Sequence, residues 1–194
     1  ICTEAGNYSA SADYYIDATG NGNLAALCGC SYECGDPIDG RITPASTGFT
    51  VVGFDESYDG TDGGAQKRAY SDMLLENGIK ISAEEAGIVR LPAMKQWDMS
   101  IDYQYGVSPT DIRSMTKATI NSRKEIFQAI ETHKTIPGYE QLWLTHTGEH
   151  LGIREGRRVF GKYRITLDDI MEGKRFEDGI CLVRSKVDLH KTHS

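Results

Sequence analysis

A glycine-rich segment near the start of the chain has the residue types and spacing of a dinucleotide-binding turn. Residues 14–29 read YYIDATGNGNLAALCG, in which Gly20, Gly22 and Ala25 fit the pattern G-x-G-x-x-A. In a βαβ unit such small residues let the backbone approach a pyrophosphate at the start of a helix. The helix that follows is short here, because Cys28-Gly29-Cys30 comes at once, and so short a crossover cannot return the chain parallel to the first strand. The spacing therefore argues against a primary dinucleotide site, and a tight strand-to-helix turn explains the glycines equally well.

A second pattern, H-x-x-E-H, runs from His146 to His150. On a helix, the two histidines would share one face and could bind zinc, with Glu149 as a general base. Gly148 weakens a helix at this point by about 1 kcal/mol relative to alanine, and no evident second helix follows to supply a third ligand. A zinc hydrolase that uses His146 and His150 is therefore the third alternative for function, and we expect no stoichiometric metal.

The cysteines could in principle form a thiol site. There are five, an odd number, which argues against a disulfide framework: Cys2, Cys28, Cys30, Cys34 and Cys181. Cys30 and Cys34 have a spacing that zinc accepts, but a second pair is missing. We therefore expect small buried cysteines in a reducing compartment, and a cytoplasmic location.

Four arginines lie in the alternating segment 152–166, which we expect to form a long strand, and three of them are close together: Arg154, Arg157 and Arg158. Alternation places Arg154 and Arg158 on one face of that strand and Arg157 on the other. A guanidinium fixed on a strand is a bidentate donor suited to a carboxylate, so one of these arginines could bind an anionic small molecule. The alternative is a solvated strand edge in which the arginines pair with nearby acids.

Composition limits the class of protein. The chain has 194 residues and a formal net charge of −7, which suits one medium domain and gives no clustered basic face for nucleic acid. No run of about 18 apolar residues is present, so no segment is expected to span a membrane.

The expected fold that positions these residues is mixed α/β, of the α+β kind: a mixed sheet with helices mainly on one face. The strand 152–166 should be central, covered by the helix 108–134. In the first half of the chain we expect two strands around a Gly6-Asn7 turn, the second reaching Tyr14–Ile16, and then a short helix that is capped by Asn23 and ends at Leu27. A strand should follow at 42–55, then a helix at 65–76 that ends at Asn77-Gly78, and then short strands within 79–105. In the second half we expect the long helix capped by Ser108, a short helix from Thr166 with Asp169 as capping partner, and a last strand at 179–185.

Nearly the whole chain resembles one family. The segment YIDATGNGNLAALCG resembles the IDATGDGDLA segment of the FAD-dependent oxidoreductases with a glutathione-reductase-like fold. Residues 136–180 resemble that family's Pro-Gly, then "lGvREsRri.G.y.lt..Dv", then "r.F.D.Ia". VDLH, at 187–190, is similar to its "iDiH". These landmarks extend from Tyr15 to His190.

The resemblance implies a cofactor and a site. In this family, the Ala-Thr-Gly turn lies against an FAD that an N-terminal fingerprint already holds, which implies FAD contacts from Ala18, Thr19, Gly20 and Gly22. It also implies that an arginine of the 152–166 strand faces the flavin or an anionic small-molecule substrate. Arg154 and Arg158 are therefore the candidate catalytic residues.

The chain also departs from the family pattern. Asn21 and Asn23 stand where aspartates are usual, and neither the N-terminal glycine-rich strand nor the closing C-terminal stretch is found. We therefore expect a central fragment: residues 1–40 as a remnant of the FAD-binding domain, 41–190 as the substrate domain and 191–194 as a tail. His190 and His193 would be exposed. Alone, such a chain should be inactive and should not hold FAD tightly, because its partners would be the missing nucleotide-binding segments. The alternative is a stand-alone binding or structural module of the same fold.

Overall fold

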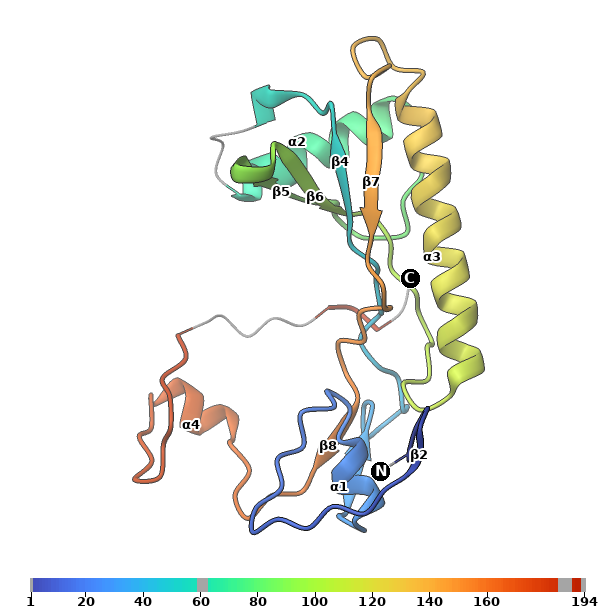
Figure 1. The fold of residues 1–194 in the computed structure, drawn as a ribbon. Coiled ribbons are helices and arrows are strands. Elements are labelled where there is room, and N and C mark those ends of the chain that lie inside the picture. Colours follow the sequence, from blue (N-terminus) through green and yellow to red (C-terminus); the bar gives the residue numbers. More distant parts are fainter. Residues whose placement is uncertain (1, 59–62, 185–189, 193–194) are drawn as a thin grey trace. The chain divides into compact units, whose positions relative to one another are not determined.

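The computed structural model describes residues 2–58, 63–184 and 190–192 (Figure 1). The chain forms two compact units, which we call unit 1 (residues 1–33 and 157–176) and unit 2 (residues 34–156 and 177–194). The first division lies near the predicted boundary at residue 40. However, unit 1 also takes residues from late in the chain, which the sequence did not indicate. The assignment of 1–40 and 41–190 to a nucleotide and a substrate domain stays a prediction.

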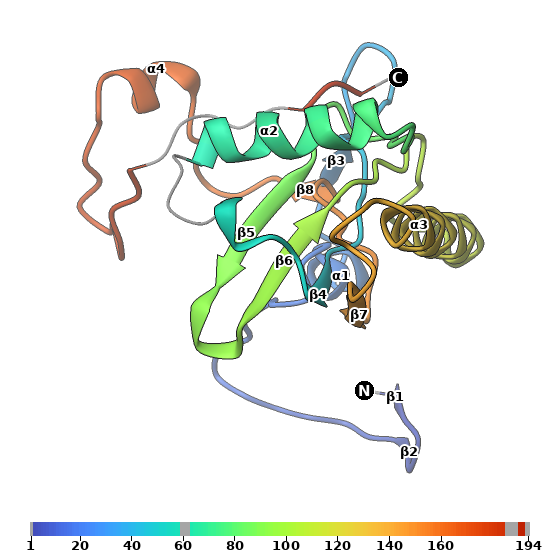
Figure 2. The same cartoon turned by 90° about the horizontal axis from the view of Figure 1, so that it is seen from above.

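The sheet of unit 2 has four strands in the order β5-β6-β4-β7. All three pairings are antiparallel, and Figure 2 shows the strands side by side. Their bounds are β4 Phe49–Val52, β5 Gly87–Leu91, β6 Gln96–Ser100 and β7 Trp143–Thr147. Phe49 pairs with Met99, which pairs with Ile88. Side chains opposite one another share a face, so these three point into one core.

Two helices cover that face of the sheet, as predicted. They are α2 (Gly63–Glu76) and α3 (Ile112–His133), and both views show α3 beside β7. One core cluster joins the sheet to both helices; its members include Phe49, Val51, Ile88, Trp97 and Met99 from the strands and Tyr70, Leu74, Ile126 and Ile130 from the helices. Short 3-10 turns lie at Glu56–Tyr58 and Pro92–Met94. None of the helices in the described residues is long and apolar enough to cross a membrane.

The ends of these helices show what local sequence can determine. Gly78 ends α2 as predicted: its φ is +71°, and the N–H groups of Gly78 and Ile79 donate to the carbonyls of Leu75 and Leu74, the Schellman arrangement. The predicted start of α3 is wrong. Asp111, not Ser108, is the N-cap, and its carboxylate accepts from the Arg113 N–H at 3.0 Å.

Unit 1 contains shorter elements, although the last residue of one of them, Cys34, is assigned to unit 2. They are β1 Cys2–Thr3, β2 Gly6–Asn7, α1 Asn23–Leu27, β3 Tyr32–Cys34, β8 Arg157–Val159 and α4 Leu167–Met171. The opening turn lies at residues 4–5 rather than at Gly6-Asn7, and Tyr14 and Ile16 are exposed and outside any strand. The helix α4 forms as predicted, with a full capping box between Thr166 and Asp169.

The long strand predicted at 152–166 is wrong. Only Arg157–Val159 is a strand, and it pairs with β3 rather than lying at the centre of the four-stranded sheet. Glycines at 152, 156 and 161 interrupt the alternation, and glycine weakens a strand interior because it has no side chain to pack. The strand predicted at 179–185 is also absent from its described part, residues 179–184. Ser185 lies outside the described residues.

Candidate functional site

The Asp17–Gly22 segment of unit 1 forms a hydrogen-bonded turn against α1. Asp17 Oδ1 accepts from both the N–H and the hydroxyl of Thr19, at 3.0 and 2.6 Å. Asp17 Oδ2 accepts from the Ala25 N–H at 2.9 Å, and Thr19 Oγ1 accepts from the Asn23 N–H at 2.8 Å. Asp17 and Thr19 therefore satisfy the first N–H groups of α1, a role that the sequence assigned to Asn23. The hydrogen bonds from Thr19 and Ala25 lower the pKa of Asp17 to about 2, so it stays ionised.

Glycine is favoured at the two glycine positions of this turn, Gly20 and Gly22, for different physical reasons. Both have positive φ, +77° at Gly20 and +61° at Gly22, where a side chain is strained. A Cβ on Gly22 would also lie 3.1 Å from Val159 Cγ2, whereas a Cβ on Gly20 would meet nothing within 4 Å. Gly22 thus allows packing on β8, while Gly20 lies at an open surface. The predicted cofactor residues Ala18, Thr19, Gly20 and Gly22 form one continuous turn, and their contact with FAD stays a prediction.

Arg157, which was not one of the two candidate catalytic arginines, joins β8 to this turn. Its Nη1 donates to the Asn21 carbonyl at 3.1 Å and to Asn23 Oδ1 at 2.7 Å. Its guanidinium carbon lies 5.1 Å from the centre of the Tyr32 ring, a cation–π distance. The signal that could have found this contact was the pair Asn21 and Asn23, which the resemblance described above places where aspartates are expected. A carboxylate there would be an ion-pair partner for an arginine.

The two candidate catalytic arginines belong to different units. Arg158 belongs to unit 1, where its Nε donates to Glu33 Oε1 at 3.1 Å. Arg164 contacts the same carboxylate, and the two arginines, Arg158 foremost, lower the pKa of Glu33. Arg154 belongs to unit 2, so the predicted shared strand face is wrong. A catalytic role for either residue stays a prediction.

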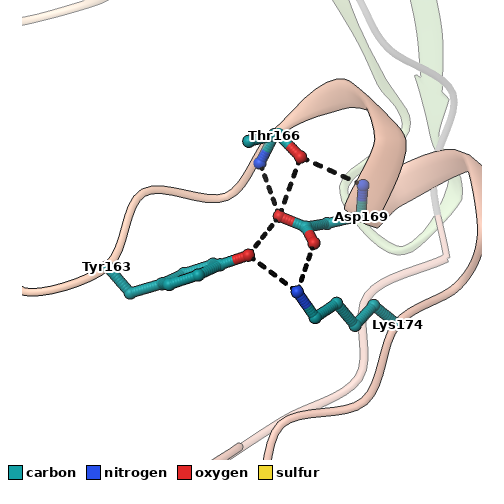
Figure 3. A network of polar contacts seen from close by, with 4 residues as sticks. All are labelled: Tyr163, Thr166, Asp169 and Lys174. Carbon is teal, nitrogen blue, oxygen red and sulfur yellow. Dashed lines mark hydrogen bonds and ion pairs between the residues drawn. The ribbon is translucent and has the colours of Figure 1, made fainter.

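A second polar network in unit 1 fixes the start of α4 (Figure 3). The carboxylate of Asp169 accepts from Tyr163, Lys174 and Thr166 at distances of 2.6 to 2.9 Å. The ammonium of Lys174 also donates to the Tyr163 oxygen at 2.9 Å. Lys174 and Tyr163 hold the pKa of Asp169 far below its usual range, and Asp169 holds that of Lys174 well above its usual range. Both groups therefore stay ionised near neutral pH, which suits a structural clamp better than a proton donor.

The geometry for the zinc pattern is not formed. His146 lies in strand β7, and His150 follows in a loop, so the two do not share a helix face. No group of three or more His, Cys, Asp or Glu side chains in the described residues could hold a metal ion. The expectation of buried cysteines is wrong for the four cysteines whose side chains are described: Cys28, Cys30, Cys34 and Cys181 are exposed. The Cys2 side chain lies outside that description.

The prediction that His190 and His193 are exposed is wrong for His190 and is not tested for His193. His190 is half-buried in unit 2, and its Nδ1 lies 2.9 Å from the Tyr103 hydroxyl oxygen. His193, and most of the VDLH segment, lie outside the described residues.

Comparison with known proteins gives a single family. Neither a curated protein nor a solved structure matches the chain. The family model described as FAD dependent oxidoreductase matches residues 1–194, the full length of the sequence. The chain therefore belongs to the FAD-dependent oxidoreductase family.

Proposed function

We propose that unit 1 makes a secondary, backbone-mediated contact to FAD in an intact FAD-dependent oxidoreductase, and that unit 2 carries the substrate side of the reaction. FAD would supply the redox chemistry when bound. The role of unit 1 is to present a smooth surface to part of the cofactor. The alternative function is a stand-alone binding or structural module of the same family.

The Asp17–Gly22 turn is the observation that carries the proposal. Asp17 and Thr19 direct their side-chain oxygens toward each other and toward α1. Ala18, Thr19 and Gly20 are nevertheless exposed, and the space beside Gly20 is open. The surface that a ligand meets at Gly20 is therefore backbone without an obstructing side chain, which allows close approach.

The charges of this turn decide which part of FAD it fits. Asp17 is ionised, and the stretch from Asp17 to Gly22 contains no lysine or arginine. The Asp17 carboxylate repels a pyrophosphate, and the cation placed at the turn, Arg157, is already bonded to Asn21 and Asn23, so the turn fits an uncharged part of the cofactor better. A tight pyrophosphate site needs free N–H groups at a helix N-terminus, whereas those of α1 at Asn23 and Ala25 are already bonded to Thr19 and Asp17.

The first test is FAD titration of the purified 194-residue chain. A single backbone contact must offset roughly 4–15 kcal/mol of lost translational and rotational freedom. We therefore expect no flavin absorbance after purification and a Kd weaker than about 1 μM by calorimetry. Yellow protein, or a tighter Kd, would show that this chain holds the pyrophosphate itself.

The second test uses the intact enzyme and a matched pair of glycines. Gly20 and Gly29 both have positive φ, +77° and +82°, and both face open space. Gly20→Leu and Gly29→Leu therefore impose the same backbone strain. We expect only Gly20→Leu to weaken FAD binding, by about tenfold or more. Equal effects would exclude a specific contact at Gly20.

A further inference from the structure

Three extended segments of unit 2 are joined side by side next to the four-stranded sheet. Isolated bridges pair Ala45 with Gln104 and Ser46 with Gly152. Their N–H···O distances are 2.7 to 3.3 Å. The buried carboxylate of Asp102 accepts from the next backbone N–H, that of Thr47, at 3.0 Å. These hydrogen bonds place residues 46, 103 and 154 on a fixed backbone framework.

Arg154 is held on this framework by a hydroxyl and a ring. Its Nη2 donates to Ser46 Oγ at 3.1 Å, and its guanidinium carbon lies 5.9 Å from the centre of the Tyr103 ring. The Arg154 side chain is otherwise exposed, and no carboxylate of the described residues forms an ion pair with it. Four other arginines do have such partners: Arg41, Arg90, Arg158 and Arg164.

Tyr103, the ring beneath Arg154, is itself fixed from two sides. Its hydroxyl oxygen lies 2.9 Å from His190 Nδ1, and the two rings meet edge to face at 5.4 Å. Its backbone N–H donates at 2.8 Å to Ser82 Oγ, and this hydroxyl donates to Glu125 at 2.8 Å. An ion pair of 2.9 Å between Lys191 and Glu84 holds the residue that follows His190. The ring that supports Arg154 is therefore anchored before any ligand arrives.

From this arrangement we propose that Arg154 binds the carboxylate of a small anionic substrate, with Ser46, Tyr103 and His190 as positioning residues. The proposal rests on the proposed function, in which unit 2 carries the substrate side. A guanidinium is planar, and a carboxylate matches its N–H groups in a bidentate pair. Because Arg154 is already held, little side-chain entropy is lost on binding. The chain has a net charge of −7, so general attraction does not favour anions and binding must come from this local site.

The test titrates the 194-residue chain, without flavin, with succinate, with its uncharged analogue succinamide and with inorganic phosphate. The readout is the NMR signal of the arginine Nε–H groups. We expect a saturable shift of the Arg154 signal with succinate, with a Kd on the order of millimolar. Succinamide should produce no shift, and phosphate a weaker one. Arg113 provides the control signal, since it is exposed on α3 and forms no ion pair with the described residues.

Variants separate the charge from its positioning. Arg154→Gln should weaken succinate binding by about tenfold or more, whereas Arg113→Gln should leave it unchanged. Arg154→Lys keeps the charge but loses the planar fork, so we expect a loss of about threefold to tenfold. Tyr103→Phe keeps the ring and removes the bond to His190; we expect a smaller loss than with Tyr103→Leu, which removes the ring as well.

Several results would overturn the proposal. They are the absence of a saturable Arg154 shift up to about 50 mM succinate, unchanged binding in a folded Arg154→Gln variant, and tighter binding of phosphate than of succinate. If the Arg154→Gln variant fails to fold, an unchanged affinity of the Arg154→Lys variant for succinate would also overturn the proposal. The titration contains no flavin and reports on unit 2, so its failure is distinguishable from failure of the FAD contact in unit 1.

Discussion

The carboxylate of Asp17 and the backbone N–H of Ala25 are joined by a 2.9 Å hydrogen bond across eight positions of the chain. This bond closes the glycine turn onto the first turn of α1. The spacing of Gly20, Gly22 and Ala25 therefore belongs to a capped turn between a loop and a helix, in which an aspartate and a threonine replace the phosphate that a dinucleotide fingerprint would bind.

Asp17 should make unit 1 sensitive to acid. Its pKa in the folded chain is about 2, below the ordinary value of 3.8. Because the folded pKa is the lower one, its stabilisation is present above pH 4 and is lost as the pH falls toward 2. We expect the protection factors of the Asn23 and Ala25 amides, which correct for the intrinsic pH dependence of exchange, to fall over this range, and to be lower in Asp17→Ala at neutral pH.

Asp13 is the matched control for Asp17, since it is exposed and lies four positions earlier in the same segment. Asp13→Ala should leave the exchange of the α1 amides unchanged. If both variants accelerate exchange equally, the effect comes from net charge and not from the cap.

The pair Asn23 and Arg157 predicts a stabilising substitution. Asn23→Asp converts the 2.7 Å bond to Arg157 Nη1 into an ion pair and adds a carboxylate to the first turn of α1. We expect the free energy of unfolding to rise by up to about 1 kcal/mol, since the pair is partly exposed. Chemical denaturation of the chain measures the change.

Asn21→Asp makes the same change in net charge two positions away. Asn21 contacts Arg157 through its backbone carbonyl, which the substitution leaves in place. We expect a change within about 0.5 kcal/mol. A gain as large as that of Asn23→Asp would mean that Arg157 responds to charge anywhere in the turn.

The capping box of α4 can be tested at its hydroxyl. Thr166→Ala removes the acceptor for the Asp169 N–H. We expect it to destabilise α4 by about 1 kcal/mol. Faster amide exchange at Asp169 and Ile170 would measure this loss. Thr166→Ser keeps the hydroxyl and should retain most of the protection. Similar exchange in the two variants would assign the stability of α4 to the Lys174 ion pair instead.

His133 should make unit 2 less stable in mild acid. Its ring is buried, and Nδ1 lies 2.7 Å from the Ala129 carbonyl, an acceptor, so Nδ1 carries the proton. Burial lowers the pKa of His133 below 6.5, so protonation favours the unfolded chain as the pH falls below that value. The loss of stability should reach at most about 1.4 kcal/mol per pH unit.

His133→Gln is the variant that isolates this effect, because glutamine does not titrate. The difference in free energy of unfolding between the natural chain and this variant should shrink between pH 7 and pH 5. Of the aromatic neighbours, Tyr70 and Tyr139 have raised pKa values and do not titrate in that range. A difference independent of pH would place the His133 pKa at its ordinary value.

The sequence correctly predicted two helix ends that are determined by residues only a few positions apart. Thr166 and Asp169 are three positions apart and form a capping box with no help from distant residues. Asn77-Gly78 ends α2 for the same reason. The hairpin β5-β6 also lies within the region predicted to contain short strands.

Long-range pairing decided what the sequence could not predict. The strand at Arg157–Val159 exists because it pairs with β3, and Arg158 bonds to Glu33, 125 positions away. Alternation along 152–166 contains no information about that partner. The two candidate arginines thus fall in different units, and the framework around Arg154 depends on Ser46 and Tyr103, which no local motif marks.

The discontinuous path of unit 1 has a consequence for synthesis on the ribosome. Unit 1 needs residues 157–176 as well as residues 1–33. At 5–20 residues per second, the intervening residues take roughly 6–25 s to emerge. The core of the four-stranded sheet, which ends with β7, is available before then. The four-stranded sheet of unit 2 therefore has time to fold first, whereas the Asp17 turn can pack on β8 only after residues 157–159 have been synthesised.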